Sequence, residues 1–157
     1  MIPPTPSPAE AADIAAITGL AAAYSEAMCR FAVAEAVQVY TEDGVLSSPT
    51  TEDAVGRAAI EAVISRTVSG LDLLFQTMHC PLVVVHGDRA RARVPITEWA
   101  RRREDRSGLQ FLGVYDDEVV RTPEGWRFAR RRLIPVTLGR PASFTGRVQP
   151  LPPPELW

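Results

Sequence analysis

The stretch that decides the fold is residues 71–103, LDLLFQTMHCPLVVVHGDRARARVPITEWARRR. It begins a series of four strand-like runs that lasts almost to the end of the chain: 71–86, 89–103, 109–121 and 125–138. The first two runs are separated by Gly87-Asp88, a dipeptide typical of hairpin turns, and the later links also have turn composition. Short links between successive strands predict antiparallel hairpins, so this half of the chain is expected to form a meander.

Helical periodicity precedes the strands. Ser7 is a suitable N-cap, Pro8 suits the first helical position, and an apolar stripe follows at Ile14, Ile17, Ala21, Tyr24, Met28 and Phe31. A short second helix is expected at 34–40 and a brief strand at 45–48. A third helix, with its stripe at Ile60, Val63, Ile64 and Thr67, ends near Gly70. Helices followed by a meander predict an α+β fold in which the helices cover one face of the sheet.

Length and composition set the class of protein. A chain of 157 residues with 46% hydrophobic and 23% charged residues fits one globular domain. We expect that domain at 9–138, between a proline-rich leader at 1–8 and a proline-rich tail at 139–157. A net charge of −2 argues against nucleic-acid binding. The arginine runs at 101–103 and 130–132 are interpreted as solvated strand faces.

Cysteine usage and the chain's hydropathy predict the compartment. Cys29 and Cys80 provide neither a disulfide framework nor metal-ligand spacing. The first residues lack the basic and apolar segments of a signal peptide, and no run approaches the roughly 18 apolar residues of a membrane span. We therefore expect a soluble, cytoplasmic protein without membrane partners.

His79 is the most informative single residue, because it interrupts an apolar run in which a histidine must be solvated, paired or used. It is either a structural histidine bonded to a neighbouring carbonyl or a functional group. The other histidine, His86, precedes the predicted hairpin turn and is expected to face water.

Carboxylates on the strands are the second group of candidates. Glu98 is the single charge on the face that also carries Ile96, so it marks either the end of that face in solvent or a carboxylate that points into a cavity. Tyr115 and Asp117 share one strand face, and Asp117 is a further candidate if that face lines a pocket.

The chain resembles the SnoaL-like branch of the nuclear transport factor 2-like superfamily over residues 11–138. The resemblance rests on the order and spacing of six segments: YSEAMC at 24–29, YTEDGVL at 40–46, GRAAI at 56–60, HGDRARA at 86–92, GVYDD at 113–117 and GWRFARRR at 125–132. It implies a cone-shaped barrel, formed by a strongly curved, mainly antiparallel sheet that wraps on three N-terminal helices around a deep apolar pocket. Members include polyketide cyclases, ketosteroid isomerases and dehydratases, and others have no demonstrated chemistry, so the fold alone does not assign a function.

The resemblance also suggests a site. Dehydratase-like members pair a tyrosine of the first helix with a histidine of the long strand, and Tyr24 and His79 match those positions. An imidazole titrates near neutrality and can act as general base, while a tyrosine hydroxyl can donate to a developing enolate oxygen. This pair needs neither a metal nor an organic cofactor. The side chains expected to line the same pocket are Cys29, Phe75, Ile96, Tyr115 and Asp117.

Cys29 departs from the family pattern, because the relatives usually carry an aspartate there. Three alternatives follow from this difference. Glu98 supplies the missing carboxylate, the chemistry is an isomerisation or cyclisation that needs only a base and a hydrogen-bond donor, or the site only binds a ligand.

The resulting hypothesis is a cofactor-independent lyase or isomerase for an apolar, oxygenated small molecule, such as a steroid or a polyketide intermediate. The alternative is a non-catalytic member that binds a hydrophobic ligand or a protein partner. We also expect a homodimer formed through the outer face of the sheet, because adjacent strands carry more large apolar side chains than one narrow pocket can hold: Phe111, Val114, Trp126 and Phe128.

Overall fold

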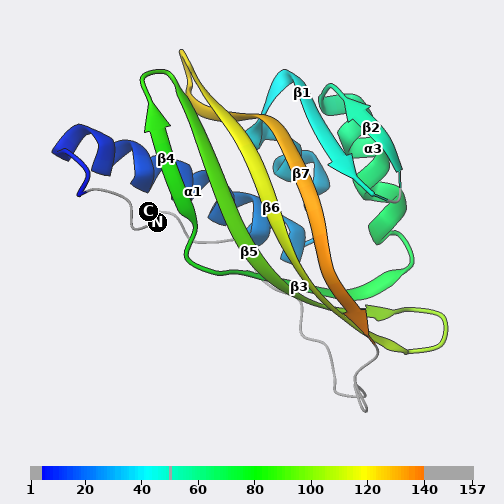
Figure 1. Ribbon diagram of the computed structural model, residues 1–157. Coiled ribbons are helices and arrows are strands. Elements are labelled where there is room, and N and C mark those ends of the chain that lie inside the picture. The colour runs from blue at the N-terminus through cyan, green and yellow to red at the C-terminus, as the bar shows by residue number, and fades with distance from the viewer. Residues whose placement is uncertain (1–4, 50, 140–157) are drawn as a thin grey trace.

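The computed structural model describes residues 5–49 and 51–139. Its helices lie in the first half of the chain, where β1 and β2 precede α3, and the other five strands follow α3 (Figure 1). The helical elements are α1 (Pro8–Cys29), α2 (Val33–Ala36), the 3₁₀ turn η1 (Val37–Val39) and α3 (Arg57–Val68). The strands are β1 (Tyr40–Ser48), β2 (Thr51–Val55), β3 (Leu71–Met78), β4 (Leu82–His86), β5 (Arg89–Arg102), β6 (Gly108–Thr122) and β7 (Gly125–Gly139). The predicted leader and tail lie largely outside the described residues.

Helix α1 forms for the reasons that its sequence indicates. The Ser7 hydroxyl accepts the backbone N–H of Glu10, whose carboxylate accepts the backbone N–H of Ser7, so both halves of a capping box are present. The predicted stripe is buried at Ile17, Tyr24 and Met28. Because this face is buried, the side chains of Tyr24 and Met28 in the second half of α1 point into the interior of the protein.

The sheet has seven strands in the order β2-β1-β7-β6-β5-β3, and β4 also pairs with β5. All of these pairings are antiparallel except the one between β1 and β7, which is parallel. The long strands β5, β6 and β7 curve around the helices, which lie on one side of the sheet (Figure 1). The predicted α+β class and the mainly antiparallel, curved sheet are thus confirmed, although the sheet does not close into a barrel.

Three details of the strand and helix predictions were wrong. The run 71–86 is not one strand, because the chain leaves the sheet at residues 79–81 and β3 and β4 pair separately with β5. The proline at 81 explains this break, since it lacks the N–H that a continuous strand would use. The second helix is only one turn long before η1, and β2 was not predicted.

The proposed outer apolar face also needs correction. Trp126 and Phe128 are buried under the helices, and the Trp126 indole N–H donates to Asp13 of α1 at 3.0 Å. Phe111 faces the interior as well, where its ring packs over Gly113, at which a Cβ would lie 2.5 Å from the ring. Of the four residues predicted for the outer face, only Val114 lies there, because it alternates with the inward-facing Gly113 and Tyr115.

No helix in the described part of the chain is both long enough and apolar enough to span a membrane.

Candidate functional site

A cavity of about 200 Å³ lies between α1, α3 and the concave face of the sheet. Its walls are mainly apolar, and among the side chains that line it Glu98 is the one carboxylate. The lining residues are Tyr24, Met28, Leu46, Ser48, Thr51, Val63, Ile64, Thr67, Val68, Leu71, Leu74, Gln76, Ile96, Glu98, Phe111, Tyr115 and Leu133. An apolar pocket with few, convergent polar groups is the usual form of a small-molecule site.

Three polar side chains converge on the amide of Gln76, which lines the cavity. Its nitrogen donates to Glu98 Oε2 at 3.0 Å and to the Tyr115 hydroxyl at 3.3 Å. Its oxygen accepts the hydroxyl of Ser25 at 3.0 Å. These residues come from α1, β3, β5 and β6, so the curvature of the sheet brings together side chains that are far apart in sequence.

Glu98 is a carboxylate without a countercharge. It forms no ion pair with any residue in the described ranges, and the Gln76 amide is the one group there that donates to it. Burial raises the pKa of the Glu98 carboxyl above its ordinary value of 4.5, and the hydrogen bond from Gln76 opposes part of this rise. A carboxylate in this setting is a stronger base than an exposed one.

Two tyrosine hydroxyls accompany this base. Burial raises the pKa of Tyr24 and raises that of Tyr115 well above its ordinary value, so both phenols stay protonated near neutral pH. The rings meet edge to face, with centroids 5.8 Å apart. A protonated phenol in an apolar cavity can donate a hydrogen bond to an oxygen that becomes negative during a reaction.

A buried ion pair lies behind the two rings. The Arg131 guanidinium stacks 4.5 Å from the Tyr24 centroid and 4.2 Å from the Tyr115 centroid, and it makes two hydrogen bonds to Asp117, at 2.9 and 2.8 Å. Burial alone would lower the pKa of Arg131, but the charge and hydrogen bonds of Asp117 raise it above its ordinary value. Asp117 is therefore a partner of Arg131 and does not line the cavity, contrary to the sequence prediction.

The predicted placement of His79 was wrong. His79 is exposed just after the end of β3, and its ring Nε2 lies 2.8 Å from the Thr97 hydroxyl. The backbone N–H of His79 donates to the carbonyl of Pro95. It does not line the cavity and therefore does not face Tyr24 across it. Phe75 is also misplaced, because it alternates with the buried, inward-facing Leu74 and Gln76, and 47% of its surface is exposed.

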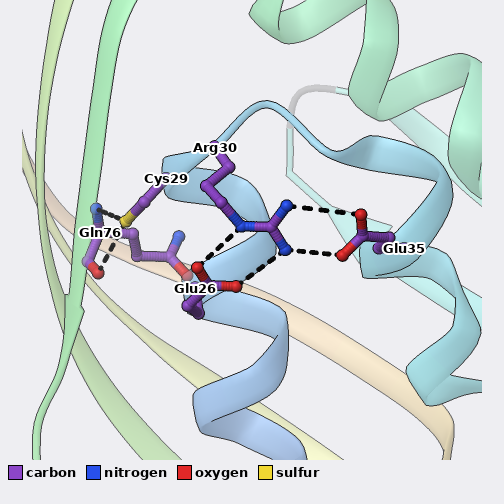
Figure 2. A network of polar contacts seen from close by, with 5 residues as sticks. All are labelled: Glu26, Cys29, Arg30, Glu35 and Gln76. Carbon is purple, nitrogen blue, oxygen red and sulfur yellow. Dashed lines mark hydrogen bonds and ion pairs between the residues drawn. The ribbon is translucent and has the colours of Figure 1, made fainter. Parts of the chain in front are cut away.

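The Cys29 thiol contacts the sheet rather than the cavity. Its sulfur accepts the backbone N–H of Gln76 at 3.2 Å and donates to the Gln76 carbonyl at 3.5 Å, as Figure 2 shows. Cys29 is thus not among the residues that line the cavity, contrary to the prediction. The predictions for Tyr24, Glu98, Ile96 and Tyr115 agree with the structure in placement, since all four line the cavity.

Gln76 is the functional residue that the sequence analysis missed. A signal was present, because Gln76 shares its strand face with Leu74, so a polar amide interrupts an apolar inward face. That signal becomes visible only when β3 is divided into its two faces. In the described part of the chain, no three His, Cys, Asp or Glu side chains converge to form a metal site.

Comparison of the sequence with known proteins identifies the family of this chain. The SnoaL-like domain model matches residues 9–132. The uncharacterised protein Rv2910c of Mycobacterium tuberculosis is 31% identical over 127 residues, which cover 80% of this chain and 86% of that protein.

Solved structures show the same fold at low sequence identity. A candidate scytalone dehydratase from Novosphingobium aromaticivorans superposes with a TM-score of 0.77 at 20% identity, covering 89% of this chain and 97% of that one. A hexachlorocyclohexane dehydrochlorinase from Novosphingobium barchaimii superposes with a TM-score of 0.81 at 13% identity, with the same coverage of 89% and 97%. The chain belongs to the SnoaL-like domain family.

Proposed function

We propose that this protein is a cofactor-independent lyase or isomerase that removes a proton from an apolar, oxygenated small molecule. Glu98 is the general base, and Tyr115 and Tyr24 are the hydrogen-bond donors. The observation that carries this proposal is the carboxylate without a countercharge in an apolar cavity, beside two protonated phenols. Glu98 takes the role that the sequence analysis gave to His79.

The reaction needs no additional reactant. Glu98 takes a proton from a carbon next to a carbonyl group, and the electron pair of the C–H bond moves into an enolate. A tyrosine hydroxyl donates to the enolate oxygen, whose negative charge is greatest in and after the transition state. Expulsion of a leaving group from the next carbon makes the reaction an elimination, whereas return of the proton to a different carbon makes it an isomerisation.

The substrate class follows from the cavity. Its lining is largely aliphatic and aromatic, with few polar side chains, which suits a flat molecule with one or two oxygen atoms. A polyketide or steroid intermediate remains the proposed substrate. The neighbours described as a scytalone dehydratase and a dehydrochlorinase carry names that denote eliminations, which supports the lyase alternative.

A binding function is the second candidate. The observation in its favour is Cys29. Its thiol stands where the relatives usually carry an aspartate, and its hydrogen bonds go to the backbone of Gln76. A binding protein would retain the cavity and show no turnover. Native mass spectrometry of freshly purified protein would identify a ligand that co-purifies.

A base-sensitive probe tests the proposed chemistry before the substrate is known. 5-Nitrobenzisoxazole is flat and apolar, and removal of its ring C–H proton breaks the N–O bond and releases a coloured phenolate. Since Glu98 must be ionised to accept the proton, we expect a rate that is constant at high pH and falls as the pH drops through the Glu98 pKa. The midpoint should lie above 4.5, because burial raises that pKa. A rate that merely follows the hydroxide concentration over the whole range would contradict the proposal.

We also propose a homodimer, formed through an outer apolar patch that differs from the predicted one. The patch consists of Phe75, Trp99, Val114, Ile134 and Val136, of which Phe75 is 47% and Val136 is 67% exposed. Phe75 pairs with Trp99 across β3 and β5, and Val114 pairs with Ile134 across β6 and β7. An exposed sheet face of this kind commonly marks an interface.

Sedimentation equilibrium should give about twice the monomer mass of 17.2 kDa, and Phe75→Glu should reduce it to the monomer value. Val55→Glu is the matched control, because Val55 is 61% exposed on β2, outside the patch. A wild-type mass of 17.2 kDa at every concentration would exclude the dimer.

A further inference from the structure

Gln76 joins the proposed base to the first helix. Its amide nitrogen donates to both Glu98 and Tyr115, and its amide oxygen accepts the hydroxyl of Ser25 on α1. A primary amide that uses its oxygen for one partner must present its nitrogen to the opposite side. The Glu98 carboxylate, which only accepts, requires the nitrogen on its side, and the Ser25 hydroxyl then donates to the oxygen on the opposite side.

Cys29 fixes the backbone of the same residue. β3 lies at one end of the strand order, with β5 as its one partner in the described sheet. The N–H and C=O of Gln76 point away from β5, and the Cys29 thiol bonds both of them. Burial raises the pKa of Cys29, so the thiol stays protonated and can donate to the carbonyl. One side chain thus takes the place of a neighbouring strand at this point.

The end of α1 that carries Cys29 is itself held in place. Arg30 forms hydrogen-bonded ion pairs with Glu26 on α1 and with Glu35 on α2, at distances of 2.6 to 3.4 Å. Figure 2 shows this network beside the contact between Cys29 and Gln76. The last turn of α1 therefore presents the thiol to β3 from a fixed position.

We propose that Gln76 is a positioning residue for Glu98, and that Ser25 and Cys29 of α1 hold Gln76 in the orientation that this role requires. The inference rests on the proposed function of Glu98 as the base. Gln76 bonds Oε2, and Oε1 accepts no hydrogen bond from the described residues, which leaves Oε1 available for the proton of the substrate. The clamp keeps that oxygen in one place during the reaction, which matters because small displacements of a base reduce the rate strongly.

No other titratable group in the described part of the chain takes over the role of Gln76 at the Glu98 carboxylate. Tyr24 and Cys29 on α1 and Tyr115 on β6 are the titratable groups that face it, and burial raises the pKa of each of the three. All of them are uncharged near neutral pH. From α3, the side chains that line the cavity are Val63, Ile64, Thr67 and Val68, which do not titrate.

Two readouts test the role of Gln76. The first is the titration of the Glu98 carboxyl by carbon NMR of labelled glutamate, assigned by the signal that Glu98→Gln removes. The second is kcat and KM for 5-nitrobenzisoxazole. In Gln76→Met, which keeps the length and loses the donor, the titration midpoint should move to higher pH, because the ionised carboxylate loses its hydrogen bond. We expect kcat at high pH to fall about tenfold to hundredfold while KM stays within about twofold.

The thiol and hydroxyl are tested separately. Cys29→Ala and Ser25→Ala should shift the titration midpoint and kcat in the same direction as Gln76→Met. Cys29→Ser should return the midpoint and kcat to the wild-type values, because a hydroxyl also donates and accepts. Cys80→Ala, at the exposed cysteine, is the matched control and should change neither.

Unchanged midpoint and kcat in Gln76→Met would overturn the inference. If that variant does not fold, unchanged values in both Ser25→Ala and Cys29→Ala would overturn it equally. The proposed function fails in a different way: the wild-type protein would then show no elimination activity, although the NMR midpoint still moves in the Gln76 variant.

Discussion

Glu98→Gln should lower kcat for the elimination of 5-nitrobenzisoxazole about 10²-fold to 10⁴-fold, the usual contribution of a general base. The amide keeps the size of the side chain and can still bond Gln76, so the cavity retains its shape. It cannot accept a proton at neutral pH. We expect KM to change little, since the lost interaction belongs to the transition state.

Two variants serve as controls for this result. Glu104→Gln removes a carboxylate from an exposed turn and should leave the rate unchanged. His79→Ala should have no more than a small effect, because the imidazole lies outside the cavity. Loss of activity in His79→Ala together with full activity in Glu98→Gln would show that the histidine, and not the cavity carboxylate, is the base.

Asp117→Ala should destabilise the folded protein by about 3–5 kcal/mol, because it leaves the Arg131 charge buried and unpaired. The pair is inaccessible to solvent, with 1% of the Arg131 side chain and 0% of the Asp117 side chain exposed. The aromatic faces of Tyr24, Tyr115 and Phe128 surround the guanidinium and cannot replace a carboxylate. Urea unfolding monitored by circular dichroism measures the difference.

The neighbouring residue provides the matched control. Asp116 pairs with Arg132, which is 57% exposed, so Asp116→Ala should cost no more than about 1 kcal/mol. The double replacement Asp117→Leu with Arg131→Met should cost less than Asp117→Ala, since it removes both charges together. A loss below about 1 kcal/mol in Asp117→Ala would contradict the assignment of a buried, structural ion pair.

The burial of Arg131 shows where strand patterns lose their predictive power. The run 130–132 was interpreted as a solvated face, and the side chains of Arg130 and Arg132 are indeed 41% and 57% exposed. Arg131 is inside because Ala129 is an extra residue on β7: Val119 pairs with Phe128, whereas Glu118 pairs with Arg130. Such a bulge reverses which residues face inward, and no feature of the arginine run marks its position.

His79 and Gln76 illustrate the same limit at the site. The apolar run around His79 correctly indicated a strand, but the direction of each side chain depends on where that strand ends. β3 ends at Met78, and Gln76 is the polar residue on the inward face. A shift of one residue along the strand moves a side chain from the cavity to solvent, because successive side chains of a strand point to opposite faces.

The sequence by itself determined the helices α1 and α3, the long strands β5, β6 and β7 with their hairpin links, the family and the burial of Tyr24, because each depends on local periodicity or on short motifs. Only the tertiary structure decided which polar groups share the cavity. Hydrogen bonds in the cavity join residues that are far apart in sequence, such as Ser25 and Gln76, which are separated by 51 positions. The side chains of Glu98 and Tyr115 join the same network, and bulges and strand ends set the directions in which these side chains point. Contacts of that kind arise from the packing of a curved sheet against α1, and local sequence carries no record of them.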